Sequence, residues 1–208
     1  MKSHDLHAKA LATMLAGLAG YVDAIGFISL SGFFVSFMSG NSTRLGVGLM
    51  NYSPAALVAA WLLASFVIGV IIGSLVGRIA GFHRRPAVLL TVAALLIAAA
   101  GFHNADIRYA SITAMVLAMG AENAVFESDG EVHIGLTYMT GTLVKIGQHM
   151  AAAMIGGDRM AWVPYLLLWA GLIAGACAGA VLYPLLGGGA FWIAAGTAAI
   201  LAVISIYK

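Results

Sequence analysis

Residues 160–207 read MAWVPYLLLWAGLIAGACAGAVLYPLLGGGAFWIAAGTAAILAVISIY and contain no Asp, Glu, Lys, Arg or His. An α-helix rises about 1.5 Å per residue, so about 20 apolar residues are needed to cross the hydrocarbon layer of a bilayer. This stretch is therefore long enough for two membrane crossings. Uncharged stretches at residues 45–77 and 86–102 predict further crossings by the same argument.

The composition of the whole chain is that of a membrane protein. Of its 208 residues, 62% are apolar and only 9% are charged, which lies far outside the range of soluble domains. The sequence lacks the alternating segments of a β-barrel, so helices are the remaining way to span a membrane. We therefore expect an all-α membrane protein.

Charge and cysteine content narrow the range of partners. The net charge of +2 is small and scattered, which argues against a nucleic-acid partner. Cys177 is the only cysteine, so one chain can form neither a disulfide framework nor a thiolate metal cage. We expect the lipid bilayer as the surrounding partner, and no metal or cofactor.

Two halves of the chain resemble each other. The segment MSGNSTRLG at residues 38–46 matches MTGTLVKIG at residues 139–147, with an offset of 101. A block upstream matches at an offset of 100, and a glycine stripe downstream matches at an offset of 102. The matched residues are Gly20, Asp23 and Ala24 with Gly120, Asn123 and Ala124; Arg44 with Lys145; and Gly69, Gly73 and Gly77 with Gly171, Gly175 and Gly179.

Each half reads as a long helix, a short polar-headed segment and two more apolar helices. The halves are residues 1–103 and 104–208, and their short segments are 34–50 and 137–152. We expect spanning helices at residues 9–29, 54–79, 86–102, 108–126, 160–184 and 189–207.

The distribution of Lys and Arg favours one topology. With six spans and a cytoplasmic N-terminus, both termini and the loop at 81–86 are cytoplasmic, and only Arg108 lies in an outer loop. Eight spans would instead move Arg78, Arg84 and Arg85 outside. We therefore expect six transmembrane helices plus two broken or re-entrant segments, arranged as two inverted three-span repeats.

Three motifs carry a resemblance to a known family: GYVDAIGF at residues 20–27, GFFVSFMSGNSTRLG at 32–46, and MTGTLVKIG at 139–147. Through them most of the chain resembles the YoaK-like family of bacterial polytopic membrane proteins, which is catalogued as a domain of unknown function. The resemblance implies a multi-pass protein of the bacterial cytoplasmic (inner) membrane. It supplies no substrate and no catalytic residues.

Two carboxylates fall inside predicted spans. Asp23 follows Lys9, and Glu122 follows Arg108, by 14 residues each, which is about 21 Å of helix. A charge at such depth costs on the order of 2.5–3.5 kcal/mol, so each carboxylate should face a partner or a wet cavity. Arg44 and Lys145 are the candidate partners. They would form two structural ion pairs, or line a solute site with carboxylates that take up protons, or both.

The motifs around Gly40 and Gly141 are rich in small and hydroxyl residues, as a broken helix requires. If a helix starts within each motif, its N-terminal N–H groups point towards the membrane centre and favour an anionic or carbonyl-bearing solute. We expect the two breaks to approach each other near the midplane; a polar kink in an ordinary helix is the alternative. The candidate pathway residues are Asp23, Asn41, Ser42, Thr43, Arg44, Glu122, Asn123, Thr140, Thr142 and Lys145.

These features predict a secondary transporter or channel for a small polar or anionic solute, with its site between the broken segments and protons as candidate coupling ions. A non-transporting membrane scaffold or signalling subunit is the alternative. An intramembrane hydrolase using Ser42 and His149 is remote, because no serine motif surrounds Ser42, and we expect no enzyme. The glycine stripes serve packing within one chain or a homodimer.

Overall fold

The computed structural model describes residues 6–128, 131–132 and 135–206, and these residues form eight α-helices with very little other structure. Two 3-10 turns, η1 (Gly81–His83) and η2 (Asn123–Phe126), and two antiparallel two-residue strands, β1 (Glu127–Ser128) and β2 (Glu131–Val132), complete the described elements. The all-helical expectation is confirmed. The helices are α1 (Leu6–Ser29), α2 (Met38–Met50), α3 (Ala55–Ala80), α4 (Arg84–Asn104), α5 (Arg108–Glu122), α6 (Met139–Met154), α7 (Val163–Leu186) and α8 (Gly189–Ile206).

Five continuous helical stretches of the described chain are long and apolar enough to cross a membrane. One of them, Ala55–Asn104, contains both α3 and α4, which the turn at Gly81 separates. This turn has a φ of 54°, which glycine adopts without strain. Helices α2 and α6 have only 13 and 16 residues and are not among the five.

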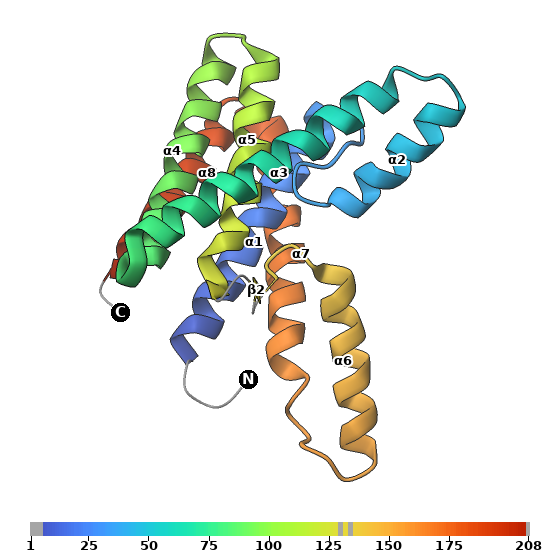
Figure 1. Ribbon diagram of the computed structural model, residues 1–208, viewed down its shortest axis with the longest axis vertical. Helices are drawn as coiled ribbons and strands as arrows, with labels where there is room; N and C mark the ends of the chain where they lie inside the picture. The colour runs from blue at the N-terminus through green and yellow to red at the C-terminus, as the bar shows by residue number, and fades with distance from the viewer. Residues whose placement is uncertain (1–5, 129–130, 133–134, 207–208) are drawn as a thin grey trace.

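The helices pack as an interlocked bundle (Figure 1). Helix α1 packs along α7, α5 packs along both α3 and α4, and α4 packs along α8. In the view of Figure 1, α1 and α4 run upward, whereas α5 and α8 run downward. Helix α2 folds back on α3, and α6 folds back on α7, so two helical hairpins extend away from the bundle in different directions.

The glycine stripes allow two of these helix crossings to be very close. A Cβ atom on Gly69 or Gly73 of α3 would overlap a backbone carbonyl of α5, and one on Gly171, Gly175 or Gly179 of α7 would overlap a backbone carbonyl of α1. Small residues permit this approach in membranes, where dispersion contacts stabilise helix pairs. The stripes therefore pack within one chain, which is the first of their two predicted uses.

Burial is concentrated in α1, α4, α5 and α8. Fully buried side chains there include Leu15, Val92, Met115 and Met119. In contrast, only Leu168 and Gly179 of α7 are buried. A helix so apolar and so exposed is suited to contact with lipid, as the composition predicts.

Candidate functional site

The chain re-enters the bundle after α1. It turns at Gly32, which has a φ of 101°, and runs back along α1 until the buried Val35 side chain lies against Gly26. Asp23 Oδ1 accepts hydrogen bonds from the backbone N–H groups of Val35, at 2.8 Å, and Ser36, at 2.9 Å. Asp23 therefore holds the segment about 9 Å below the end of α1 and satisfies donors that lipid could not.

Asn41 fixes the same segment from the other side. Its side chain is fully buried. Its Oδ1 accepts from the N–H of Phe34 at 3.1 Å, and its Nδ2 donates to the carbonyl of Phe34 at 2.7 Å. Helix α2 then begins at Met38, with Gly40 already in its first turn. The backbone break lies at residues 30–37, where Asp23 and Asn41 hold the chain. Helices α2 and α6 run without interruption through Gly40 and Gly141, so the breaks predicted at these two glycines are wrong.

The second half has a matching arrangement. Thr137 Oγ1 donates to Asn123 Oδ1 at 3.1 Å, and Asn123 Nδ2 donates to the carbonyl of Met119 at 2.9 Å. Leu136, beside Thr137, is fully buried. Helix α6 begins at Met139, again just before the glycine of its motif. Asn123 therefore holds the segment before α6 as Asp23 holds the segment before α2.

The two predicted ion pairs are wrong. No described contact joins Asp23 to Arg44 or Glu122 to Lys145; the salt bridges in the described chain involve neither pair. The Arg44 guanidinium lies 4.8 Å from the ring centre of Phe33, and Lys145 Nζ lies 5.4 Å from that of Tyr165. The carboxylate of Asp23 binds backbone amides instead, and Glu122 is enclosed in the bundle while Lys145 is exposed on α6.

The remaining polar residues of the motifs do not form a shared site. Ser42 and Thr43 are exposed and donate to carbonyls one turn earlier in α2. Thr140 is exposed on α6, and Thr142, although buried, donates to the carbonyl of Tyr138. Helices α2 and α6 pack on different partners and point apart (Figure 1). The predicted meeting of the broken segments at the midplane is therefore wrong.

Ser42 and His149 are also not brought together. Ser42 lies on α2, which packs on α3, whereas His149 lies on α6 and stacks on Tyr165 of α7, with ring centres 5.2 Å apart. The geometry therefore gives no support to the remote hydrolase hypothesis.

Glu122 is the most unusual polar residue of the bundle. It ends α5, is 0% exposed, and neither of its carboxylate oxygens has a hydrogen-bond partner among the described residues. The preceding residue, Ala121, is pressed against Gly73 of α3. A buried ionic group normally has a charged or hydrogen-bonding partner. The sequence predicts Glu122 as an ionisable group inside a span, but the partner predicted for it, Lys145, does not contact it.

A polar network that the sequence reasoning missed lies beyond Glu122. Glu127 Oε2 accepts a hydrogen bond from Ser74 Oγ at 2.6 Å and lies 2.9 Å from Arg84 Nη2. Arg78 Nε lies 3.9 Å from Glu127 Oε1, and Arg84 Nε donates to the carbonyl of Ala124 at 3.1 Å. The predicted topology places Arg78, Arg84 and the end of α5 at the same membrane face. This placement is the feature of the sequence that could have predicted the pairing of these arginines with Glu127.

The network sets the charge of Glu127. Burial by itself raises the pKa of its carboxyl, but hydrogen bonds from Ser74 and Arg84 act in the opposite direction. The positive charges of Arg84 and Arg78 lower it further, so the pKa of Glu127 lies below its ordinary value of 4.5. Glu127 is therefore an anion that ties the end of α5 to α3 and α4.

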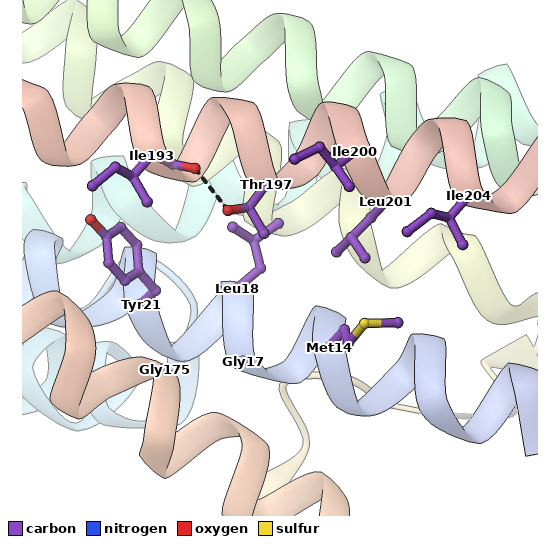
Figure 2. A pocket seen from close by; sticks show the side chains of 10 residues that line it. All are labelled: Met14, Gly17, Leu18, Tyr21, Gly175, Ile193, Thr197, Ile200, Leu201 and Ile204. Carbon is purple, nitrogen blue, oxygen red and sulfur yellow. Dashed lines mark hydrogen bonds between the residues drawn. The ribbon is translucent and has the colours of Figure 1, made fainter.

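A groove of about 360 Å³ opens between α1, α7 and α8. Figure 2 shows Tyr21 and Leu18 of α1 facing Ile193 and Thr197 of α8 across it. The two hydroxyl groups already donate within the protein, Tyr21 Oη to the carbonyl of Ala190 and Thr197 Oγ1 to that of Ile193. None of the predicted pathway residues lines it. The lining residues are Met14, Gly17, Leu18, Tyr21, Gly175, Ile193, Thr197, Ile200, Leu201 and Ile204.

Comparison with known proteins identifies relatives but no activity. The family described as "Protein of unknown function (DUF1275)" matches residues 11–204. The UPF0700 transmembrane protein RA0705 of Rhizobium meliloti (strain 1021) is 37% identical over 186 residues, which cover 88% of this chain and 80% of that protein. The UPF0700 transmembrane protein YoaK of Bacillus subtilis (strain 168) is 28% identical over 148 residues, 67% of this chain and 66% of that protein. No solved structure matches.

Proposed function

Because the chain belongs to the DUF1275 family, whose curated relatives are transmembrane proteins, we propose that it is a proton-coupled secondary transporter for a small polar solute. The observation that carries this proposal is the position of Glu122. Its carboxyl group is buried in the helix bundle at the end of α5 and has no hydrogen-bond partner in the described chain. Ionisable groups inside a membrane are rare and costly, and they mark proton relays and transport pathways. A proton is the partner that such a carboxyl group can both take up and release.

The packing supports two inverted repeats as the transporting framework. The sequence matches relate α1 to α5 and α3 to α7, and the order of the helices within each half then relates α4 to α8. The contacts follow this relation, since α1 packs on α7 as α5 packs on α3, and α4 packs directly on α8. Matched helices α1 and α5 run in opposite directions in Figure 1, as do α4 and α8. Inverted repeats of this kind support alternating access to a site at their interface.

The two re-entrant segments suggest where a polar solute is handled. In the first segment Asp23 of α1 holds two backbone N–H groups, and in the second Asn123 of η2 holds the hydroxyl group of Thr137. Irregular backbone inside a membrane is tolerated where it is buried in protein or lines a cavity. We propose that these segments gate opposite ends of the pathway in a protein of the bacterial inner membrane with six spans and cytoplasmic termini.

The test uses the full chain in proteoliposomes that contain a pH-sensitive dye. Small anions and neutral polar solutes are added in turn, with a proton gradient imposed. We expect at least one solute to cause proton entry, Glu122→Gln to lose that proton entry while keeping solute exchange, and Glu122→Asp to retain part of it because a titrating group remains. Unchanged proton entry in Glu122→Gln, or no response to any solute, would contradict the proposal.

One observation favours a non-transporting scaffold instead. The carboxylate of Asp23 serves backbone amides, which is a structural use, and Arg44 and Lys145 lie on aromatic rings outside the bundle interior. In a scaffold, Glu122 would only lower the stability of the fold, because replacing a buried unpaired ionic group by a neutral one is stabilising or neutral. A higher unfolding temperature for Glu122→Gln, together with no flux in the wild type, would support this second function.

A further inference from the structure

The groove between α1, α7 and α8 marks a place where the two halves of the bundle are packed differently. We propose that this groove is a binding site for one acyl chain of a membrane phospholipid. The site requires only that the chain lies in a membrane, and it does not depend on transport.

The close helix crossings of the two halves have equivalent contacts. Gly69 of α3 lies against the carbonyl of Leu117, and Gly175 of α7 lies against that of Gly17. Residues 17 and 117 correspond at the offset of 100 that relates α1 to α5. The equivalent of Gly69 is therefore Gly175, and the match to Gly171 drawn from the sequence is wrong by one turn.

The next contact along each crossing agrees with this register. Gly73 lies against the carbonyl of Ala121, and Gly179 lies against that of Tyr21. Residues 21 and 121 again differ by the offset of 100. The α3/α5 and α1/α7 pairs are therefore two copies of one arrangement, and the halves differ in the helix that packs beside each pair.

Helices α4 and α8 make that difference. Helix α4 packs extensively along α5 and also along α3, whereas α8 packs less extensively along both α1 and α7. Matched residues show the effect, since Ala114 of α5 is 5% exposed and Met14 of α1 is 43% exposed. Helix α4 therefore closes the space beside the α3/α5 crossing, and α8 leaves the equivalent space open as the groove.

The dimensions of the groove fit one alkyl chain. It follows α8 from Ile193 to Ile204 (Figure 2), a rise of about 16 Å. This length is close to half of the hydrocarbon layer, which is about 30 Å thick. A helix about 10 Å across and equally long would fill more than about 1,000 Å³, but the groove holds about 360 Å³. A helix of a second copy is therefore too large, whereas a single chain that reaches across one leaflet has the right size.

The chemistry of the lining also favours a hydrocarbon chain. The described lining residues are uncharged, and the hydroxyl groups of Tyr21 and Thr197 already donate to backbone carbonyls. A polar solute would find no free donor there to replace its hydration. The exposed side chains of Met14 and Ile200 make the groove continuous with the lipid-facing surface of the bundle. An acyl chain can therefore enter sideways from the bilayer.

The ends of the groove give the chain a direction. At one end Tyr21 of α1 is hydrogen bonded to the carbonyl of Ala190 in α8. At the other end Met14 follows Lys9, the charged residue near the start of α1, by about 8 Å. A phospholipid headgroup must stay at the membrane surface, and the surface beside Lys9 is the nearer one. The terminal methyl group therefore lies towards Tyr21.

The test uses the full chain, freed of lipid in detergent, and native mass spectrometry with added palmitoyl-oleoyl phosphatidylglycerol. Thr197→Phe places a ring in the groove, and Met14→Trp fills it from the opposite wall. The matched control Val203→Phe adds the same ring at an exposed position of α8 that does not line the groove. We expect wild type and Val203→Phe to hold one phospholipid per chain, and both filled variants to bind it about tenfold more weakly or worse.

Two further measurements locate the chain and identify it. The phospholipid should raise the unfolding temperature of wild type and Val203→Phe but not of the filled variants, because only an open groove binds it. A diazirine at the end of the oleoyl chain should cross-link to α1 and α8 near Tyr21.

Three outcomes would overturn the site. The first is equal phospholipid binding by wild type and both filled variants. The second is cross-linking spread evenly over the exposed helices. The third is a different occupant: palmitate bound in preference to the phospholipid, or a lipid-free wild-type dimer that Thr197→Phe converts to a monomer.

Discussion

At the residue scale, Asp23 and Asn41 hold the chain between α1 and α2 through hydrogen bonds to its backbone. The sequence predicts Asp23, Asn41 and Asn123 as parts of a solute pathway, which stays a prediction; what the structure shows is a hydrogen bond from each to the segment before α2 or α6. Arg44 was chosen as a partner for Asp23 because only another charge is visible in a sequence. Two backbone N–H groups bind the Asp23 carboxylate instead. A sequence does not indicate which N–H groups these are, because every residue except proline carries one.

Replacement of Asp23 tests this assignment. Asp23→Ala should lower the free energy of unfolding by about 1–3 kcal/mol, because the N–H groups of Val35 and Ser36 lose their acceptor. Arg44→Gln, the matched control, should cost less than about 1 kcal/mol, since it loses only an interaction with the ring of Phe33. Thermal unfolding in detergent measures both. Equal losses, with recovery in the double mutant, would restore the ion-pair hypothesis.

At the scale of elements, hydropathy predicts where the helices lie, but it does not predict where a helix begins or ends beside polar side chains. The helix expected at 54–79 is Ala55–Ala80, because an uncharged run and a terminal glycine define it. The break expected at Gly40 lies at residues 30–37 instead, since side-chain hydrogen bonds determine it. Glu127 was missed because its network joins α3, α4 and the end of α5, which are distant in sequence.

The Glu127 network predicts a specific pH dependence. The folded pKa of Glu127 lies below its ordinary value of 4.5, so its ionised form stabilises the fold at pH values above 4.5. This contribution is lost as pH falls through the lowered pKa. Glu127→Gln should cost on the order of 1–3 kcal/mol at neutral pH, and the difference from wild type should shrink in acid. The unfolding midpoints of both proteins should be measured from pH 7 down to about pH 3. A difference that stays constant over this range would exclude an ionised Glu127.

At the scale of the whole molecule, the internal repeat is visible in the sequence, but the way its halves interlock is not. Matched motifs say which helices correspond, yet nothing in them says that α1 packs on α7 rather than on α3. That choice depends on backbone approach at glycines such as Gly17 and Gly175. Composition shows only that these helices can pack closely, and both the partner and the register follow from the assembled bundle.

The orientation of this assembly in the membrane is the last prediction. The turn with Phe82 adjoins Arg78, Arg84 and Arg85, so it should be cytoplasmic, whereas Asp106 lies in the opposite turn beside α5. Tyr52 lies just beyond the end of α2, Met154 ends the matched helix α6, and both side chains are strongly exposed. In inverted repeats they must lie on opposite sides, and in parallel repeats on the same side.

Single cysteines at these four positions, in the Cys177→Ala background, can be reacted with a membrane-impermeant maleimide. We expect Tyr52→Cys and Asp106→Cys to react from outside in intact cells, and Phe82→Cys and Met154→Cys to react only in inverted vesicles. The physical reason is that Lys and Arg are retained on the cytoplasmic side during insertion. If Tyr52→Cys and Met154→Cys react from the same side, the repeats are parallel, and alternating access between two inverted repeats is excluded.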